Sequence, residues 1–284
     1  MTGFTLRNLL VYFKDKASVF FSLLAVFIII GLYALFLGDV WVKGFPGMTG
    51  VRFMMDSWIV SGLLAVASVT TTMGAFGTMV VDKRDKITKD FTSSPMKRSA
   101  IVSGYTLSAY FIGVIMSLVT LVLAELYILS NGGELLNGSE LVKVLGLVLL
   151  GTFTNTSIIL FIVSFFKSTN AFSTASTIIG TLIGFLTGIY LPVGELPGAV
   201  QWVVKIFPVS HTASLFRQVI MERPITATFA GAPQSSITDF KETMGVFLMF
   251  GDKPASPLLS VMVLILTAAL FYALAFINVS RKRK

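Results

Sequence analysis

Long apolar stretches, separated by short charged or glycine-rich segments, dominate the hydropathy pattern of this chain of 284 residues. Each of the six stretches has 21 residues or more, whereas a helix needs about 20 to cross the hydrocarbon core of a bilayer. Apart from Glu125 in the third and Lys143 in the fourth, they contain no acidic or basic side chain. The pattern predicts an all-α integral membrane protein with one membrane domain, residues 1–284. Its six transmembrane helices are expected at residues 17–37, 57–81, 101–129, 141–166, 171–191 and 258–278.

The distribution of lysine and arginine predicts the orientation of these helices. With the N-terminus in the cytoplasm, 14 of the 22 basic residues lie on the cytoplasmic side, as the positive-inside rule requires. The others lie outside, mostly between the fifth and sixth helices. We therefore expect both termini inside (N-in/C-in). The net charge of +8 is then a topology signal, and no nucleic-acid partner is expected.

Two further segments predict helices that do not cross the membrane. In residues 3–16, apolar side chains recur at helical spacing opposite polar ones, which is typical of an amphipathic elbow helix on the membrane surface; a frayed basic tail is the alternative. The extracytoplasmic segment 192–257 contains two apolar pieces around Pro208, each of about 10–12 residues and too short to span. They favour an outer re-entrant helical hairpin between helices five and six. Residues 225–236 are expected to form an exposed loop, and residues 237–250 an amphipathic helix.

Composition and motifs limit the chemistry of the chain. Charged residues make up 13% of it, whereas soluble domains have about 25%. There is no cysteine and a single histidine, His211, so neither disulfides nor a histidine-based metal site is expected. The patterns G-x-x-x-x-G-K-[ST], H-E-x-x-H and G-x-S-x-G are all absent. We therefore expect no enzyme activity, no metal and no cofactor on this chain; if transport uses ATP, another polypeptide must bind it.

Three features inside the apolar stretches are candidates for helix packing or for a substrate path. Glu125 is an acidic residue well inside a stretch, which makes it a functional candidate, unless it simply reaches the interface near the outer end of its helix. Gly180, Gly184 and Gly188 recur every four residues, so they predict a close-packing groove within the subunit or at a dimer interface, or a lining for substrate. Asn155 lies in mid-span, where helix–helix bonding and a polar lining are both open.

The largest predicted cytoplasmic loop, residues 82–100, is densely charged. A solvated loop that obeys the positive-inside rule would have this composition. The aromatic Phe91 among the charges, and a turn before the next helix, favour a docking site for a cytoplasmic partner instead. The residues expected to dock an ATPase partner are Asp82, Lys83, Arg84, Asp85, Lys86, Thr88, Phe91, Ser94 and Pro95.

Three segments together resemble a known family. RNLLVYFKDKASVF is similar to an elbow helix that runs into a first span, DKRDKITKDFTSSPMKRSAIVSGY to an inner loop, and LPVGELPGAVQWVVKIFPVSHTASLFRQ to an outer re-entrant hairpin. With six spans, they resemble the permease (transmembrane) subunit of bacterial ATP-binding cassette exporters of the type-2 permease family, which have the type V exporter fold. The family's usual Glu-Arg-x-x-Gly-Thr-like run is replaced by Asp85-Lys86-Ile87-Thr88, without the glycine.

The resemblance implies an exporter in the bacterial inner membrane. Two permeases, identical or paralogous, would sit in the lipid above two cytoplasmic ATP-binding cassette subunits, which would hold the ATP and Mg²⁺. The substrate moved out would be amphipathic: drug-, peptide- or lipid-like. Two other classes remain open. One is a membrane anchor or sensor that recruits a cytoplasmic partner. The other is a secondary transporter or channel, although the chain lacks the paired intramembrane charges that such proteins often use.

Overall fold

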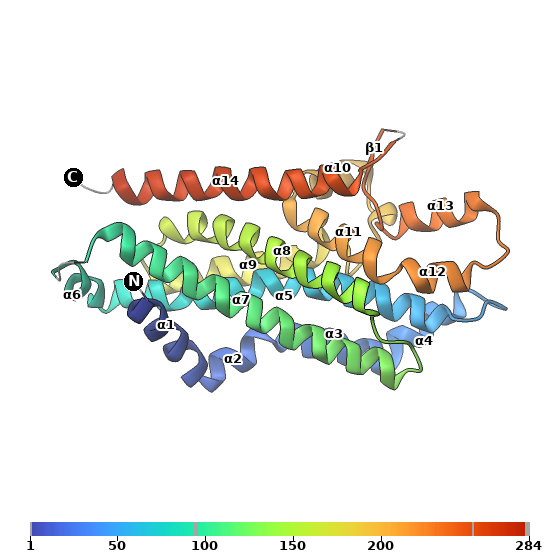
Figure 1. Ribbon diagram of the computed structural model, residues 1–284, viewed down its shortest axis with the longest axis horizontal. Helices are drawn as coiled ribbons and strands as arrows, with labels where there is room; N and C mark the ends of the chain where they lie inside the picture. The colour runs from blue at the N-terminus through green and yellow to red at the C-terminus, as the bar shows by residue number, and fades with distance from the viewer. Residues whose placement is uncertain (1, 94–95, 252, 282–284) are drawn as a thin grey trace.

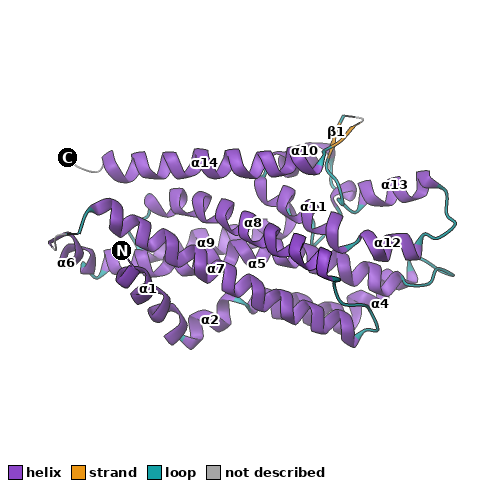
Figure 2. Cartoon of the chain, in the orientation of Figure 1, coloured by secondary structure: helices purple, strands orange, loops and turns teal. Residues whose placement is uncertain are grey.

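The computed structural model describes residues 2–93, 96–251 and 253–281, and its long helices run roughly side by side (Figure 1). Helix α1 (Thr2–Lys14) and the last turns of α14 (Pro257–Arg281) lie toward one end of the bundle, which we call the terminal end. Helices α12 (Glu222–Thr228) and α13 (Gln234–Thr243) lie at the opposite, distal end. The two described strands, β1 (Met249–Phe250) and β2 (Lys253–Pro254), pair in an antiparallel ladder, and helix dominates the rest (Figure 2).

Six segments of the described chain are long and apolar enough to cross a membrane. Five of them lie at predicted spans, with ends that differ by a few residues. Helix α5 has 34 residues and is therefore about 51 Å long at 1.5 Å per residue, so it projects beyond a hydrocarbon core of about 30 Å. The apolar pattern predicts only the part of this helix that lies in lipid, whereas the helix itself continues into polar residues at both ends. The five helices are α5 (Val51–Arg84), α7 (Arg98–Ser130), α8 (Gly138–Ser164), α9 (Thr169–Leu186) and α14.

The first span differs most from its prediction. Residues 17–37 do not form one helix, because α2 ends at Ser22 and α3 begins only at Leu24. The segment able to cross the membrane is Leu24–Lys43. Its polar end is stabilised because Asp39 pairs with Arg52 at 2.8 Å, a contact across 13 residues that hydropathy does not reveal. The pieces are α2 (Lys16–Ser22), α3 (Leu24–Leu32), a π-helical turn (Tyr33–Leu37) and α4 (Gly38–Lys43).

Helix α5 forms the core of the bundle. In its most apolar window, 89% of the residues are buried, and it packs against α7, α8, α9 and α11 (Pro208–Ile220). By contrast, only 11% of the corresponding window of α9 and 22% of that of α14 are buried. These two helices therefore present most of their surface to lipid or to another protein chain.

The segment between α9 and α14 is more helical than predicted. The loop expected at 225–236 begins as part of α12. Pro224 lies in the first turn of that helix, where backbone N–H groups have no partner within the helix, so its missing N–H costs no helical hydrogen bond. The helix expected over 237–250 ends at Thr243, because Gly245 takes a left-handed backbone (φ +64°) and β1 follows. The other elements here are η2 (Val193–Glu195), a 3₁₀ turn, and α10 (Gly198–Ile206).

Candidate functional site

The terminal end of the bundle carries an ion pair between α1 and α5. The Arg7 guanidinium donates two hydrogen bonds to the Asp82 carboxylate, at 2.5 and 3.0 Å. The Tyr105 hydroxyl of α7 donates a third, at 2.6 Å. The hydrogen bond to Asp82 raises the pKa of Arg7 above its usual value. Only 2% of Asp82 is exposed, so this residue of the predicted docking loop holds α1 against α5 and α7 and does not present a free surface.

Aromatic rings surround this ion pair and bring α6 (Ile87–Ser93) to it. The Phe4 ring contacts the rings of Phe91 and Tyr105, with centroids 4.8 and 4.9 Å apart. Arg7 lies over the Phe91 ring, 5.5 Å from its centroid. Phe4 packs where Gly104 has no side chain, since a Cβ there would lie 2.4 Å from the ring. We call this group the elbow cluster: Phe4, Arg7, Asp82, Phe91 and Tyr105.

Among the described residues predicted to dock a partner, three consecutive ones at residues 84–86 are exposed, in the turn where α5 ends. Arg84 and Asp85 are exposed and pair with each other at 2.7 Å. Lys86 is exposed and has a left-handed backbone (φ +62°), a conformation that glycine adopts far more easily. The loop therefore presents a compact charged turn beside the elbow cluster. Of the other predicted docking residues, Lys83 and Thr88 are half-buried, and Ser94 and Pro95 lie outside the described residues.

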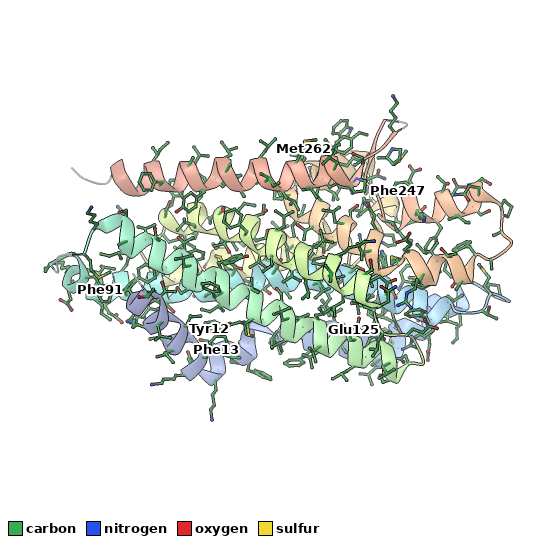
Figure 3. The ribbon with its side chains drawn as sticks, in the orientation of Figure 1. Tyr12, Phe13, Phe91, Glu125, Phe247 and Met262 are labelled. Carbon is green, nitrogen blue, oxygen red and sulfur yellow. The ribbon has the colours of Figure 1, made fainter. Side chains whose placement is uncertain are left out.

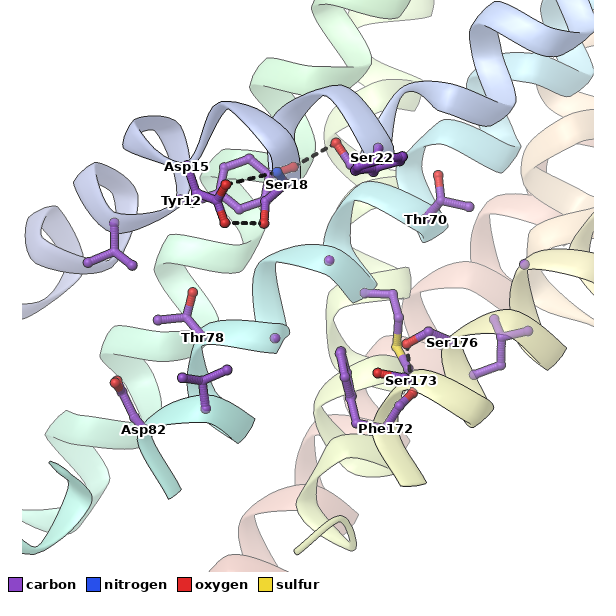
Figure 4. A pocket seen from close by; sticks show the side chains of 18 of the residues that line it. Tyr12, Asp15, Ser18, Ser22, Thr70, Thr78, Asp82, Phe172, Ser173 and Ser176 are labelled. Carbon is purple, nitrogen blue, oxygen red and sulfur yellow. Dashed lines mark hydrogen bonds between the residues drawn. The ribbon is translucent and has the colours of Figure 1, made fainter. Parts of the chain in front are cut away.

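A cavity of about 660 Å³ lies between α2, α5 and α9, next to the elbow cluster (Figure 4). Thr70 and Thr78 line it from α5, and Ser173 and Ser176 from α9, together with apolar side chains and the charged Arg7, Asp15 and Asp82. Its volume is in the range of about 300–1,000 Å³ found for small-molecule sites. Polar and apolar side chains in one cavity suit an amphipathic molecule, which can make hydrogen bonds with the first and hydrophobic contacts with the second.

The three glycines predicted to form one stripe have three different surroundings. Gly180 lines the cavity, and apart from its chain neighbours and the backbone of its own helix, no described atom lies within 4 Å of the place its Cβ would take. The Tyr190 ring fills the space beside Gly184. Gly188 follows the end of α9, with φ +69°. The N–H groups of residues 188 and 189 bond the carbonyls of 185 and 184, the pattern by which a glycine terminates a helix. The predicted packing groove therefore does not include Gly188. A glycine four residues after another can equally well end the helix, and the spacing alone does not distinguish the two cases.

Neither Glu125 nor Asn155 lines this cavity. Glu125 lies toward the distal end of α7 (Figure 3), where its carboxylate accepts a hydrogen bond from the backbone N–H of Leu136 at 3.0 Å. The Asn155 amide of α8 donates to the Ser68 hydroxyl of α5 at 2.8 Å. The structure thus places Glu125 at the connection between α7 and α8, and Asn155 between two packed helices.

The distal end contains a buried arginine to which sequence reasoning assigned no role. Arg217 of α11 is 1% exposed. It donates to the Thr187 carbonyl at 2.8 Å and to the Gly245 carbonyl at 3.4 Å, and its guanidinium lies 5.1 Å from the centre of the Trp58 ring. None of the ion pairs among the described residues includes it. A backbone carbonyl at the end of α9, another after α13 and an aromatic face therefore take the place of a carboxylate.

His211, on the same helix, packs between α10 and α14. Its ring nitrogens lie 3.0 Å from the Ser260 hydroxyl of α14 and 3.0 Å from the Lys205 carbonyl of α10. Burial lowers the pKa of His211 below its usual value. Within the described ranges, no group of three His, Cys, Asp or Glu side chains is placed to hold a metal ion.

Comparison with known proteins identifies the family of this bundle. The family model described as ABC-2 family transporter protein matches residues 48–277, from just before α5 to near the end of α14. The chain belongs to the ABC-2 transporter family. It is thus a multi-pass membrane permease of an ABC transporter, and the family implies association with a cytoplasmic ATP-binding subunit. A search of the curated proteins found no match to the chain.

The family match defines which parts of the permease are shared and which precede them. It includes the exposed turn at 84–86, α6 and the hydroxyl groups that α5 and α9 contribute to the cavity. Helix α1 and the span Leu24–Lys43 lie before it. The elbow cluster therefore joins an element outside the match, through Phe4 and Arg7, to elements inside it.

Proposed function

We propose that this permease is the membrane-spanning subunit of an ATP-driven exporter in the bacterial inner membrane. Both termini and the turn at 84–86 face the cytoplasm in this proposal, in keeping with the positive-inside rule. The partner subunit holds the ATP and Mg²⁺, and the permease itself binds no cofactor. An amphipathic drug-, peptide- or lipid-like substrate moves outward. The family match over residues 48–277 is the observation that carries the proposal.

The elbow cluster supports a coupling role for the terminal end. The exposed turn follows α5 without a linker, and Asp82 lies in the last turn of that helix. A partner that pulled on residues 84–86 would therefore move α5 and, through the Arg7–Asp82 pair, α1 as well. ATP shifts the permease between states only if the partner binds those states with different affinity. The charged turn is the surface where that difference is expected to arise.

The cavity between α2, α5 and α9 supports a substrate path through the same half of the bundle. Its hydroxyl and apolar lining fits an amphipathic substrate. Helix α9 is little buried, and Gly180 opens toward the cavity, which favours a second permease copy, identical or paralogous, as the missing wall. On the distal side, α10 and α11 have 9 and 13 residues. Neither reaches the ~20 needed to span, so they suit a re-entrant hairpin that closes the outer side.

Purification of the full chain from its native membrane, followed by mass spectrometry and flux assays in proteoliposomes, tests the proposal. We expect a P-loop ATPase at equal stoichiometry and ATP-dependent efflux. The variant Arg84→Ala/Asp85→Ala/Lys86→Ala should lose efflux, whereas Lys253→Ala on β2 should not.

The rival functions predict different outcomes of the same experiment. A partner that binds without any substrate flux would favour an anchor or sensor. A chain that purifies alone and moves substrate without ATP would favour a secondary transporter or channel.

A further inference from the structure

A second cavity, of about 900 Å³, lies at the distal end between α8, α11 and the start of α14. Phe247 lines it and marks its position in Figure 3. It shares no described lining residue with the cavity beside the elbow cluster. It is therefore a separate site, at the other end of the molecule.

Two lysines line this cavity. Lys143 comes from the first turns of α8, and Lys241 from α13. Neither takes part in an ion pair among the described residues. Glu222 is the one acidic residue among the described lining residues, which also include the cation Arg217 and the amide of Gln218. The cavity is therefore net positive, and an anionic group would gain charge-assisted hydrogen bonds there.

The remaining walls of the cavity are apolar and adjoin the lipid-facing side of the bundle. Leu147 and Leu150 of α8 and Val261 of α14 line it. The neighbouring surface of α14 is highly exposed, with 67% of Leu258 and 52% of Ile265 accessible. Helices α8 and α14 pack along one another (Figure 1). A ligand bound in the cavity can therefore extend a hydrocarbon chain out along this pair of helices and into the bilayer.

We propose that this distal cavity binds the phosphodiester headgroup of a membrane phospholipid, with the lipid's acyl chains lying along α8 and α14. The phosphate meets the ammonium groups of Lys143 and Lys241. Positive pockets between transmembrane helices hold phospholipid headgroups for the same reason. A lipid is favoured over a free phosphate because an inorganic ion has no apolar part that could contact the apolar walls. The bound lipid bridges α8, α13 and α14, and so holds α13 against the last span.

Lipid retention and thermal stability of the full chain test this site. The purified wild type is stripped of loose lipid, and bound lipid is counted by native mass spectrometry. The unfolding temperature is then measured with added phosphatidylglycerol, diacylglycerol or inorganic phosphate. We expect phosphatidylglycerol alone to raise it. The variant Lys143→Gln/Lys241→Gln should bind phosphatidylglycerol about 10- to 30-fold more weakly, the factor expected for losing two lysine–lipid interactions.

Matched variants separate a specific site from a general charge effect. Lys205→Gln/Lys253→Gln removes the same charge from distal positions that do not line the cavity and should retain lipid like the wild type. Lys143→Arg/Lys241→Arg should also retain it. Equal retention by both Gln double variants would overturn the proposal, as would equal stabilisation by diacylglycerol or by inorganic phosphate. If the first double variant does not fold, the single Lys143→Gln change, at an exposed position, decides by the same readouts.

Discussion

The guanidinium of Arg217 lies 5.1 Å from the centre of the Trp58 ring, and the two side chains bind adjacent carbonyls of the segment after α13. Arg217 reaches the Gly245 carbonyl at 3.4 Å, and the Trp58 indole N–H reaches that of Met244 at 2.8 Å. Burial lowers the pKa of Arg217 from its usual value. Among the described residues no ion pair includes Arg217, so backbone carbonyls and an aromatic face stabilise its charge. The pair joins α5, α9 and α11 at the distal end.

Replacing Arg217 should loosen this end of the bundle. The Arg217→Ala change leaves the carbonyls of Thr187 and Gly245 without their donor, which should lower the free energy of unfolding by about 1–3 kcal/mol. Thermal unfolding in detergent measures the effect, with the exposed Lys253→Ala change as a control. An unchanged unfolding temperature in the Arg217 variant would show that these contacts contribute no net stability.

The ion pair of the elbow cluster should be needed for coupling more than for folding. Asp82→Asn keeps the size of the side chain but leaves Arg7 without its counter-charge. Arg7 is one-third exposed, so the expected cost is about 1–2 kcal/mol, between the values for exposed and buried pairs. ATP-dependent efflux should fall more steeply than partner binding. The double variant Arg7→Gln/Asp82→Asn serves as the control for stability, since it removes both charges. Full efflux in Asp82→Asn would contradict a coupling role.

The left-handed backbone of Lys86 predicts a stability series at one position. Lys86→Gly relieves the steric cost of φ +62° and should stabilise the protein by about 0.5–1 kcal/mol, after the greater entropy of the unfolded glycine is deducted. Lys86→Asn should be close to neutral, whereas Lys86→Val should destabilise, because a β-branched residue tolerates this conformation least. Unfolding temperatures of the three variants give the order. The reverse order would mean that the turn rearranges.

His211 predicts a specific loss of stability in mild acid. Its pKa is lowered in the folded protein from the usual 6.5. Below about pH 6.5 the unfolded chain therefore takes up a proton that the folded protein does not, and stability falls until the pH reaches the lowered value. Above this window the ring is neutral in both states and contributes no pH dependence. Unfolding temperatures between pH 7.5 and 5 should drop less in His211→Gln than in the wild type. Identical slopes would exclude His211 as the cause.

The docking loop shows where prediction from sequence ends. A dense run of charges correctly indicated a polar connection after the second span, but composition could not separate exposed residues from buried ones. Asp82 and Asp85 look equivalent in the sequence. The structure buries Asp82 because Arg7, 75 positions away, and Tyr105, 23 positions away, both reach it. Among the described residues, Asp85 forms an ion pair only with its neighbour Arg84, and it stays exposed. Whether such an aspartate is buried depends on how the helices pack together, which a local sequence pattern does not reveal.

The sequence by itself determined that this is an all-helical membrane protein with six candidate spans. Lipid offers no hydrogen bonds to the backbone, so an apolar stretch of sufficient length becomes a helix whatever its neighbours are. The tertiary structure alone decided that Asp39 of the first span pairs with Arg52 and that Arg217 is buried. These outcomes depend on contacts between distant segments, such as the Arg52–Asp39 pair and the Thr187 carbonyl. Their energies arise only once the helices have packed.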